Sequence, residues 1–293
     1  MFKEYCAQKV AVIEAELGNL LKSDENIAPM LHEAMEYSLF AGGKRLRPIL
    51  LMAAAEAVSG KNGEKYSKPA CALEMIHTYS LIHDDLPAMD DDDYRRGNLT
   101  NHKVYGEGIA ILAGDALLTN AFEVVLRQED VMPERLLAVV REFSEAAGYN
   151  GMVGGQVIDL LSENKRVDIH TLELMHKAKT GALFRAAIRS GAILAGANRR
   201  QLAALTSYAE NFGLAFQITD DILDVVGEMD KIGKPIGSDI KNNKSTYVTL
   251  YSLEKAKKMA DAAVERAVAS LEIFEKEAEF LRCAVRYLIT RDH

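Results

Sequence analysis

The 293-residue chain has no tryptophan, only 6 prolines and 3 cysteines, and no excess of basic residues. Its 35 lysines and arginines are outnumbered by 43 aspartates and glutamates, which gives a formal net charge of −8. General nucleic-acid binding requires a basic face, so we expect no nucleic-acid partner. The shortage of proline, together with abundant alanine, leucine, glutamate and lysine, favours helices over sheets.

The cysteines, Cys6, Cys71 and Cys283, are dispersed, and no pair of them has metal-ligand spacing. Such thiols are typical of proteins that remain reduced. Residues 1–17 carry acidic side chains at helical spacing and lack the unbroken apolar core of a signal peptide. No stretch approaches the roughly 18 apolar residues expected of a membrane span. The sequence therefore predicts a cytoplasmic protein without a membrane span.

Hydrophobic residues recur with a period near 3.6 in nearly every segment between turn signals. No alternating strand pattern persists, and no change of composition marks a second domain. We therefore predict that residues 1–293 form a single all-α domain, a helical bundle. The expected helices cover about 2–22, 29–40, 46–59, 68–85, 108–127, 133–147, 150–162, 169–178, 180–197, 199–226, 253–270 and 272–290.

Two segments, 86–107 and 227–246, lack this periodicity but are rich in functional side chains. Loops of about 20 residues inside a compact domain are usually functional or disordered. Because both segments carry basic residues and adjoin aspartate clusters in the sequence, we expect them to act as lids.

The most informative feature is a pair of aspartate clusters embedded in apolar, helix-like stretches. Unpaired buried charge is very costly, so such clusters require compensation. Carboxylates suit a hard cation, and Mg²⁺ held by a few of them completes its shell with water and substrate phosphates. We therefore predict a Mg²⁺-bridged phosphate or diphosphate substrate in a cavity shared by both clusters. The predicted metal ligands are Asp84, Asp85, Asp90, Asp220, Asp221 and Asp224.

The second cluster occupies one side of a helix. Asp220 and Asp224 are four residues apart and stack on one face, with Gln217 close to that face one turn earlier. The flanking positions are almost all apolar, which a solvated acidic helix would not tolerate. The pattern therefore indicates a site rather than a charged surface.

The first cluster requires a break in its helix. Asp84 and Asp90 are six residues apart, which places them on different faces of an ideal helix. Pro87 disfavours helical geometry at Leu86 and removes a backbone donor. We therefore expect the helix to loosen there and Asp90 to fold back toward Asp84. Spacing assigns no role to the aspartates at 91–93.

Basic residues follow a matching pattern. The segment 42–48, GGKRLRP, opens a helix, where backbone amides and the helix dipole already favour an anion. Lys44 and Arg47 would add charge-assisted hydrogen bonds to phosphate. Arg95 and Arg96 directly follow the acidic run and are suited to forming a fork on a diphosphate.

Together these motifs resemble the trans-type isoprenyl diphosphate synthases, most closely the bacterial farnesyl diphosphate synthases. The resemblance spans nearly the whole chain, and its long first aspartate motif is highly specific. It is carried by GGKRLRP (42–48), IHTYSLIHDDLPAMDDDDYRRG (76–97), GGQVIDL (154–160), KTGALF (179–184), FQITDDILD (216–224), GKPIGSD (233–239) and KSTY (244–247).

The resemblance implies an all-α fold whose helices surround a deep central cavity, usually as a homodimer. It implies that the six aspartates hold three Mg²⁺ ions on an allylic diphosphate. The catalytic residues it implies are Lys179, Thr180 and Gln217, and the allylic substrate would contact these three together with Arg95, Lys234 and Lys244. Isopentenyl diphosphate would bind Lys44, Arg47, His77 and Arg96.

Product length is expected to depend on Tyr79, five positions before Asp84 and deeper along the same helix. A chain anchored by its diphosphate would grow down that helix, and Tyr79 is bulky enough to floor the cavity, whereas Ser80 beside it is not. An aromatic residue at this place resembles the bacterial farnesyl synthases, which stop at fifteen carbons. We therefore expect dimethylallyl and geranyl diphosphates to be extended to farnesyl diphosphate.

Four alternatives remain open from the sequence. A geranylgeranyl diphosphate synthase would share every motif, and a class I terpene cyclase would share Mg²⁺ but would not need a second diphosphate site. His83-Asp84, with His77 earlier in the same helix, also fits a metal-dependent HD-type phosphohydrolase. A silent regulatory subunit would be expected to lack aspartates that this chain retains.

Overall fold

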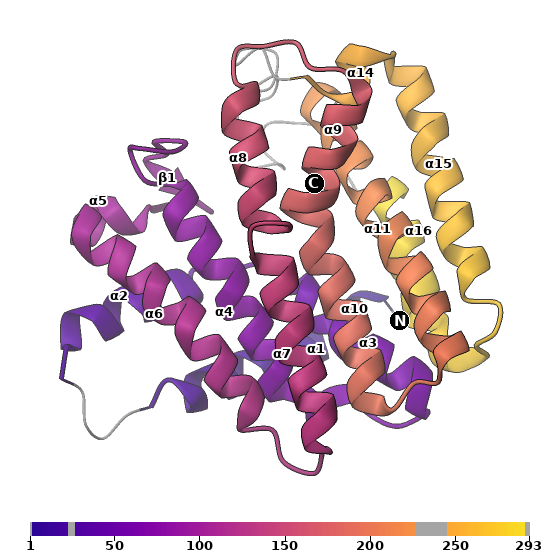
Figure 1. Ribbon diagram of the computed structural model, residues 1–293, viewed down its shortest axis with the longest axis horizontal. Coiled ribbons are helices and arrows are strands. Elements are labelled where there is room, and N and C mark those ends of the chain that lie inside the picture. Colours follow the sequence, from indigo (N-terminus) through magenta and orange to yellow (C-terminus); the bar gives the residue numbers. More distant parts are fainter. Residues whose placement is uncertain (1, 23–26, 227–244, 291–293) are drawn as a thin grey trace.

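The computed structural model describes residues 2–22, 27–226 and 245–290. These residues are helical almost throughout, so the all-α prediction is confirmed (Figure 1). The α-helices are α1 (Phe2–Leu20), α2 (Pro29–Leu39), α3 (Leu46–Ser59), α4 (Ser67–Asp84), α5 (Asn101–Tyr105), α6 (Glu107–Leu126), α7 (Pro133–Ala147), α8 (Met152–Ser162), α9 (Ile169–His176), α10 (Ala182–Ala195), α11 (Arg199–Val226), α14 (Tyr247–Leu250), α15 (Leu253–Ser270) and α16 (Glu279–Thr290). Short helical turns are η1 (Gly63–Tyr66), η2 (Lys177–Gly181) and η3 (Lys276–Ala278).

The bundle is organised around α10, which packs against α3, α7 and α11. On one side α4 lies along α6, and on the other α11 lies along α15 (Figure 1). Large aromatic side chains such as Phe143, Phe184 and Phe212 are fully buried between these layers. Each such side chain contributes about 1.5–3 kcal/mol through burial. The helices that carry the two aspartate clusters, α4 and α11, pack in different hydrophobic clusters, and α10 connects them by contributing side chains to both.

The segment 86–107 is more ordered than expected. It contains the antiparallel strands β1 (Tyr94–Arg95) and β2 (Asn98–Leu99), followed by α5. The two residues between the strands, Arg96 and Gly97, have φ values of 54° and 82°, as a tight hairpin turn requires. Two-residue strands are too short to give a periodic signal, which is why the sequence did not reveal them.

The helix expected over 272–290 begins only at Glu279, after the short turn η3. The side chain of Arg282 reaches back to the segment that follows the end of α15. It donates to the carbonyl oxygens of Leu271 at 3.0 Å, Phe274 at 2.5 Å and Glu275 at 2.9 Å. These bonds occupy carbonyl oxygens of the segment between α15 and α16 and hold it in a non-helical conformation, so α16 begins later than predicted.

Among the described residues, α6 is the one helix long and apolar enough to cross a membrane by length and composition. The expectation that no stretch approaches such a span is therefore wrong for this helix. Packing accounts for part of this apolar surface, since α6 lies against α2, α4, α5 and α7 within the bundle. Ile111, Leu112 and Leu126 nevertheless remain exposed along it.

Candidate active site

The first aspartate cluster has the predicted fold-back. Helix α4 ends at Asp84, and the chain then turns so that the backbone N–H of Asp90 donates to the carbonyl of Asp84 at 2.9 Å. Asp91, with φ at 51°, donates its N–H to the carbonyl of Leu86 at 3.1 Å. The break near Pro87 therefore brings the ends of the motif together.

Arg95 reaches this cluster from the hairpin. Its Nε lies 2.8 and 2.9 Å from the two carboxylate oxygens of Asp85, and its guanidinium also lies 3.7 Å from Asp92. Lys103 pairs with Asp93 at 2.6 Å. The later aspartates, whose roles spacing did not assign, thus help to fix the hairpin beside the cluster.

The electrostatics of Asp84 indicate a site that suits a cation. The pKa of Asp84 is raised to about 6, chiefly by burial and also by the charge of Asp90, while Lys179 and Arg95 oppose this shift. A half-buried carboxylate among other carboxylates is stabilised by an added positive charge. The hard oxygen donors gathered here are those that Mg²⁺ prefers.

Lys179 is positioned by two elements of the bundle. It lies in η2, a π-helical turn, and its Nζ donates to Asp159 of α8 at 2.6 Å. A Cβ at Gly155 would lie 2.2 Å from the backbone nitrogen of Lys179, so only glycine allows α8 to approach this closely. Burial lowers the pKa of Lys179, but Asp159 and Asp84 outweigh it and raise the value overall.

The sequence interpretation missed Asp159 and its neighbour Gln156, although it quoted their motif. Both amide atoms of the buried Gln156 side chain lack a hydrogen-bond partner. The available signal was the spacing of Gly155, Gln156 and Asp159 on one side of α8. The reason for that spacing lies in η2, about 20 residues later in the chain.

The basic group assembles around the loop before α3. Gly42, Gly43 and Arg45 have positive φ values of 84°, 135° and 47°, and α3 begins at Leu46. The Arg96 guanidinium lies against this loop, because a Cβ at Gly43 would be 2.7 Å from its Nη1. Arg96 also donates to the carbonyl of Gly42. Adjacent hairpin residues therefore face different groups, Arg95 the aspartates and Arg96 the loop.

Arg47 lies deeper in the same region. Its guanidinium carbon is 4.6 Å from the centre of the Phe184 ring, and its Nε is buried without a hydrogen-bond partner. Burial lowers the pKa of Arg47 to about 10, while Glu74 and Asp220 oppose that effect. Burial lowers the pKa of His77 well below its ordinary value, and the charges of Arg47 and Arg96 lower it further. The structure thus brings together Arg47, Arg96 and His77.

The second cluster lies at the C-terminal end of α11. Asp221 accepts the backbone N–H of the buried Tyr247 at 2.7 Å, so it fixes the start of α14. Asp220 is within electrostatic reach of Arg47. Gln217 is half-buried one turn earlier. Lys234 and Lys244, both predicted to contact the allylic diphosphate, lie outside the described residues.

Within the described ranges, no three histidine, cysteine or acidic side chains converge into a preformed metal cluster. Thr180 lies in η2 beside Lys179, and Ser80 donates its hydroxyl to the carbonyl of His77 at 2.8 Å. The three cysteines are free, as the sequence predicts.

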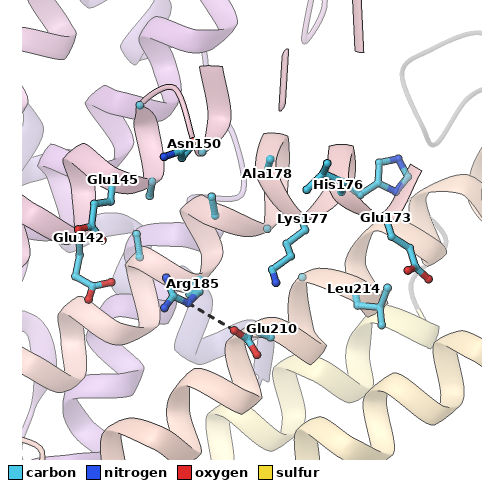
Figure 2. Close-up of a pocket in the computed structure, with 18 of the residues that line it drawn as sticks. Glu142, Glu145, Asn150, Glu173, His176, Lys177, Ala178, Arg185, Glu210 and Leu214 are labelled. Atoms are coloured by element: carbon cyan, nitrogen blue, oxygen red, sulfur yellow. Dashed lines mark ion pairs between the residues drawn. The ribbon is translucent and has the colours of Figure 1, made fainter. Parts of the chain in front are cut away.

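A separate pocket of about 1000 Å³ lies among α7, α9, α10 and α11 (Figure 2). Lys177 extends into it, and Arg185 pairs with Glu210 at 3.7 Å on its wall (Figure 2). None of the predicted site residues lines this pocket. Ala178 and Gly181, which flank Lys179 and Thr180 in η2, do line it, so the pocket adjoins η2 without including a predicted site residue.

Comparisons with known proteins agree with the geometry. The profile of the family described as polyprenyl synthetase matches residues 28–285. A dimethylallyltranstransferase from Fischerella ambigua is 50% identical over 292 residues, which cover 99% of this chain and 84% of that protein. A farnesyl diphosphate synthase from Geobacillus stearothermophilus is 44% identical, covering 99% of this chain and 98% of that protein. The solved geranylgeranyl pyrophosphate synthetase of Pyrococcus horikoshii matches with a TM-score of 0.90 at 33% identity and covers 99% of both chains.

Proposed function

The chain belongs to the polyprenyl synthetase family, and we propose that it is a member whose main product is farnesyl diphosphate. It is a prenyl diphosphate synthase, a transferase of isoprenoid biosynthesis. In the proposed reaction, dimethylallyl diphosphate and then geranyl diphosphate are each joined head to tail to isopentenyl diphosphate. We also propose that residues 1–293 form one polyprenyl synthase domain.

The observation that carries the proposal is the hairpin that connects two sites of opposite charge. Arg95 lies on the carboxylates of the first cluster, while Arg96 joins the basic loop near Arg47. A terpene cyclase, which takes one diphosphate, has no use for the second group. The pairing suits an enzyme that binds two diphosphates side by side.

The phosphohydrolase alternative conflicts with the position of His83. An HD-type site would require the His83 imidazole to bind metal together with Asp84. Instead, its Nε2 lies 3.0 Å from the carbonyl oxygen of Ile111 on α6, and its ring packs against Tyr79. The imidazole is thus engaged by α6.

Members of this family are metal-dependent, and we propose three Mg²⁺ ions for this chain. We assign these ions to the six aspartates of the two clusters, Asp84, Asp85, Asp90, Asp220, Asp221 and Asp224. Arg95 orients the carboxylate of Asp85, and the N–H of Tyr247 orients that of Asp221. Bound Mg²⁺ would supply the positive charge that the carboxylates need to accept an anionic substrate. Without it, two like charges 4 Å apart repel by about 4 kcal/mol at an effective dielectric near 20.

The cations divide between the two substrates. Lys179 and Arg95, with Lys234 and Lys244, would hold the allylic diphosphate beside the aspartates. Lys44, Arg47, His77 and Arg96 would hold isopentenyl diphosphate. The buried Nε of Arg47, which lacks a partner in the protein, provides one donor for that anion.

The chemistry then requires no strong side-chain base. The allylic C–O bond breaks, diphosphate leaves, and the isopentenyl double bond attacks the resulting cation to form a carbon–carbon bond. Loss of one proton, which the departed diphosphate can accept, restores the double bond. Lys179 and Arg95 would steady the leaving diphosphate, while Thr180 and Gln217 would line the reacting carbons.

Farnesyl rather than geranylgeranyl product is proposed on the basis of Tyr79. This side chain is bulky and only 5% exposed, on the helix that ends at Asp84. Similar proteins carry both product names, so the length must be measured directly. The test is incubation with isopentenyl and dimethylallyl diphosphates plus Mg²⁺, followed by mass spectrometry of the products. Asp84→Ala serves as the inactive control.

We further propose a cytoplasmic homodimer. The exposed apolar residues of α6, including Ile111 and Leu112, give a face that a second copy would cover. Free cysteines agree with a reducing compartment. Light scattering on the purified chain tests the assembly, and a mass equal to one chain would contradict it.

A further inference from the structure

A residue that ends chain growth must be held in place, because a side chain that the growing prenyl chain can push aside does not limit product length. Within the part of the chain that the structure describes, the ring that contacts Tyr79 is that of His83. The His83 imidazole, one turn later on α4, lies with its centroid 5.7 Å from that of Tyr79 at an interplanar angle of 82°. This edge-to-face arrangement is the favoured geometry for two aromatic rings.

His83 is itself fixed from the neighbouring helix. The carbonyl oxygen of Ile111 can only accept, so the His83 Nε2 must carry the proton that it donates across 3.0 Å. Gly114, one turn further along α6, provides the space for the ring. A Cβ at Gly114 would lie 2.2 Å from His83 Nε2 and 2.6 Å from Cδ2.

The position of Tyr79 is thus linked to α6 by two contacts in series, ring to ring and ring to backbone. Tyr79 is also close to the reacting end of the site. Burial raises the pKa of its hydroxyl to about 12, and the charge of Asp84 adds to the effect. A displacement of His83 would therefore move the Tyr79 ring, which lies near the diphosphate-anchored prenyl chain.

We propose that His83 and Gly114 are positioning residues for Tyr79 and that they help to set product length. The proposal rests on the proposed function, in which Tyr79 floors the cavity. The imidazole holds the Tyr79 ring against outward movement, and the absence of a side chain at Gly114 allows the imidazole to sit there.

The test compares product lengths of His83→Ala, His83→Phe and Gly114→Ala with those of the wild type. His83→Ala and Gly114→Ala should raise the ratio of C20 to C15 product by roughly fivefold, a change of the size expected when one edge-to-face ring contact is lost. His83→Phe keeps a ring beside Tyr79 and should stay within about twofold of the wild type. Should His83→Ala fail to fold, Gly114→Ala still tests the contact, because it displaces the ring without removing it.

Gly108 provides a matched control in the same helix, because a Cβ there would meet nothing within 4 Å. Gly108→Ala should leave the product ratio unchanged, which separates the effect of contact from that of helix propensity. The double variant Tyr79→Ala/His83→Ala should give the same ratio as Tyr79→Ala alone, since His83 acts through Tyr79.

Two failures are distinguishable. A wild type that makes no farnesyl diphosphate overturns the proposed function. A wild type that makes farnesyl diphosphate, together with unchanged ratios in His83→Ala and Gly114→Ala, overturns the positioning role alone. A further lengthening on adding His83→Ala to Tyr79→Ala would likewise contradict it.

Discussion

Lys179 donates a hydrogen bond from its ammonium group to the carboxylate of Asp159 across 2.6 Å, and the pair joins η2 to α8. Both side chains are largely buried, so the bond holds Lys179 more firmly than an exposed ion pair would. Asp84 and Asp90 lie close enough to contribute to its pKa. Lys179 is therefore oriented toward the first aspartate cluster before a substrate binds.

Removing Asp159 should weaken binding of the allylic substrate. A hydrogen bond to a charged group contributes about 1.5–3 kcal/mol, so we expect Asp159→Ala to raise the KM for geranyl diphosphate by roughly tenfold or more. The KM for isopentenyl diphosphate should change little. Asp261→Ala, at an exposed position on α15, is the matched control. Equal increases in both KM values would contradict the assignment.

Loss of a metal ligand should abolish turnover without unfolding the protein. In Asp84→Ala or Asp220→Ala, weaker Mg²⁺ binding leaves the departing diphosphate unstabilised, and kcat should fall by roughly 100-fold or more. Circular dichroism should show unchanged helix content. A near-normal rate in Asp220→Ala at limiting Mg²⁺ would exclude the two-cluster arrangement.

The two diphosphate sites should separate kinetically. Lys44→Ala and Arg47→Ala should raise the KM for isopentenyl diphosphate, by about tenfold for Arg47, much more than the KM for the allylic substrate. Lys234→Ala should show the reverse. Steady-state kinetics with one substrate saturating decides this, and three variants that weaken both substrates equally would refute the division of cations.

His77 should make folding stability depend on pH below neutrality. Burial and neighbouring arginines depress its pKa in the folded state, whereas the unfolded value is about 6.5. The unfolded chain therefore takes up the proton more readily, and the contribution of His77 is fully present above pH 6.5 and declines as the pH falls below it. Urea unfolding at pH 7.5 and 5.5 measures this. Between pH 7.5 and pH 5.5 the wild type should lose more free energy of unfolding than His77→Gln. Equal losses in the two proteins would contradict the prediction.

Local sequence rules were sufficient where one residue determined the backbone. Pro87 predicted that the helix would break and that Asp90 would return to Asp84, and the hydrogen bond between them confirms it. The four-residue spacing of Asp220 and Asp224 likewise placed both in one helix, α11.

Features that depend on distant residues could not be read from the sequence. Asp159 meets Lys179 only because α8 and η2 pack together, and the helical period gives no sign of a π-turn between 177 and 181. The late start of α16 depends on Arg282, which reaches back to the carbonyl oxygen of Phe274. Similarly, the split between Arg95 and Arg96 follows from a hairpin too short to be recognised.

The central claim is that the chain makes farnesyl diphosphate, and the length of the wild-type product tests it most directly. Purified protein is incubated with dimethylallyl diphosphate, excess isopentenyl diphosphate and Mg²⁺, and the dephosphorylated products are separated by chain length. The account predicts mainly a fifteen-carbon product that persists when isopentenyl diphosphate is in excess. A wild type that makes mainly twenty-carbon product would contradict the role given to Tyr79, and a complete absence of prenyl diphosphates would contradict the two-site interpretation itself.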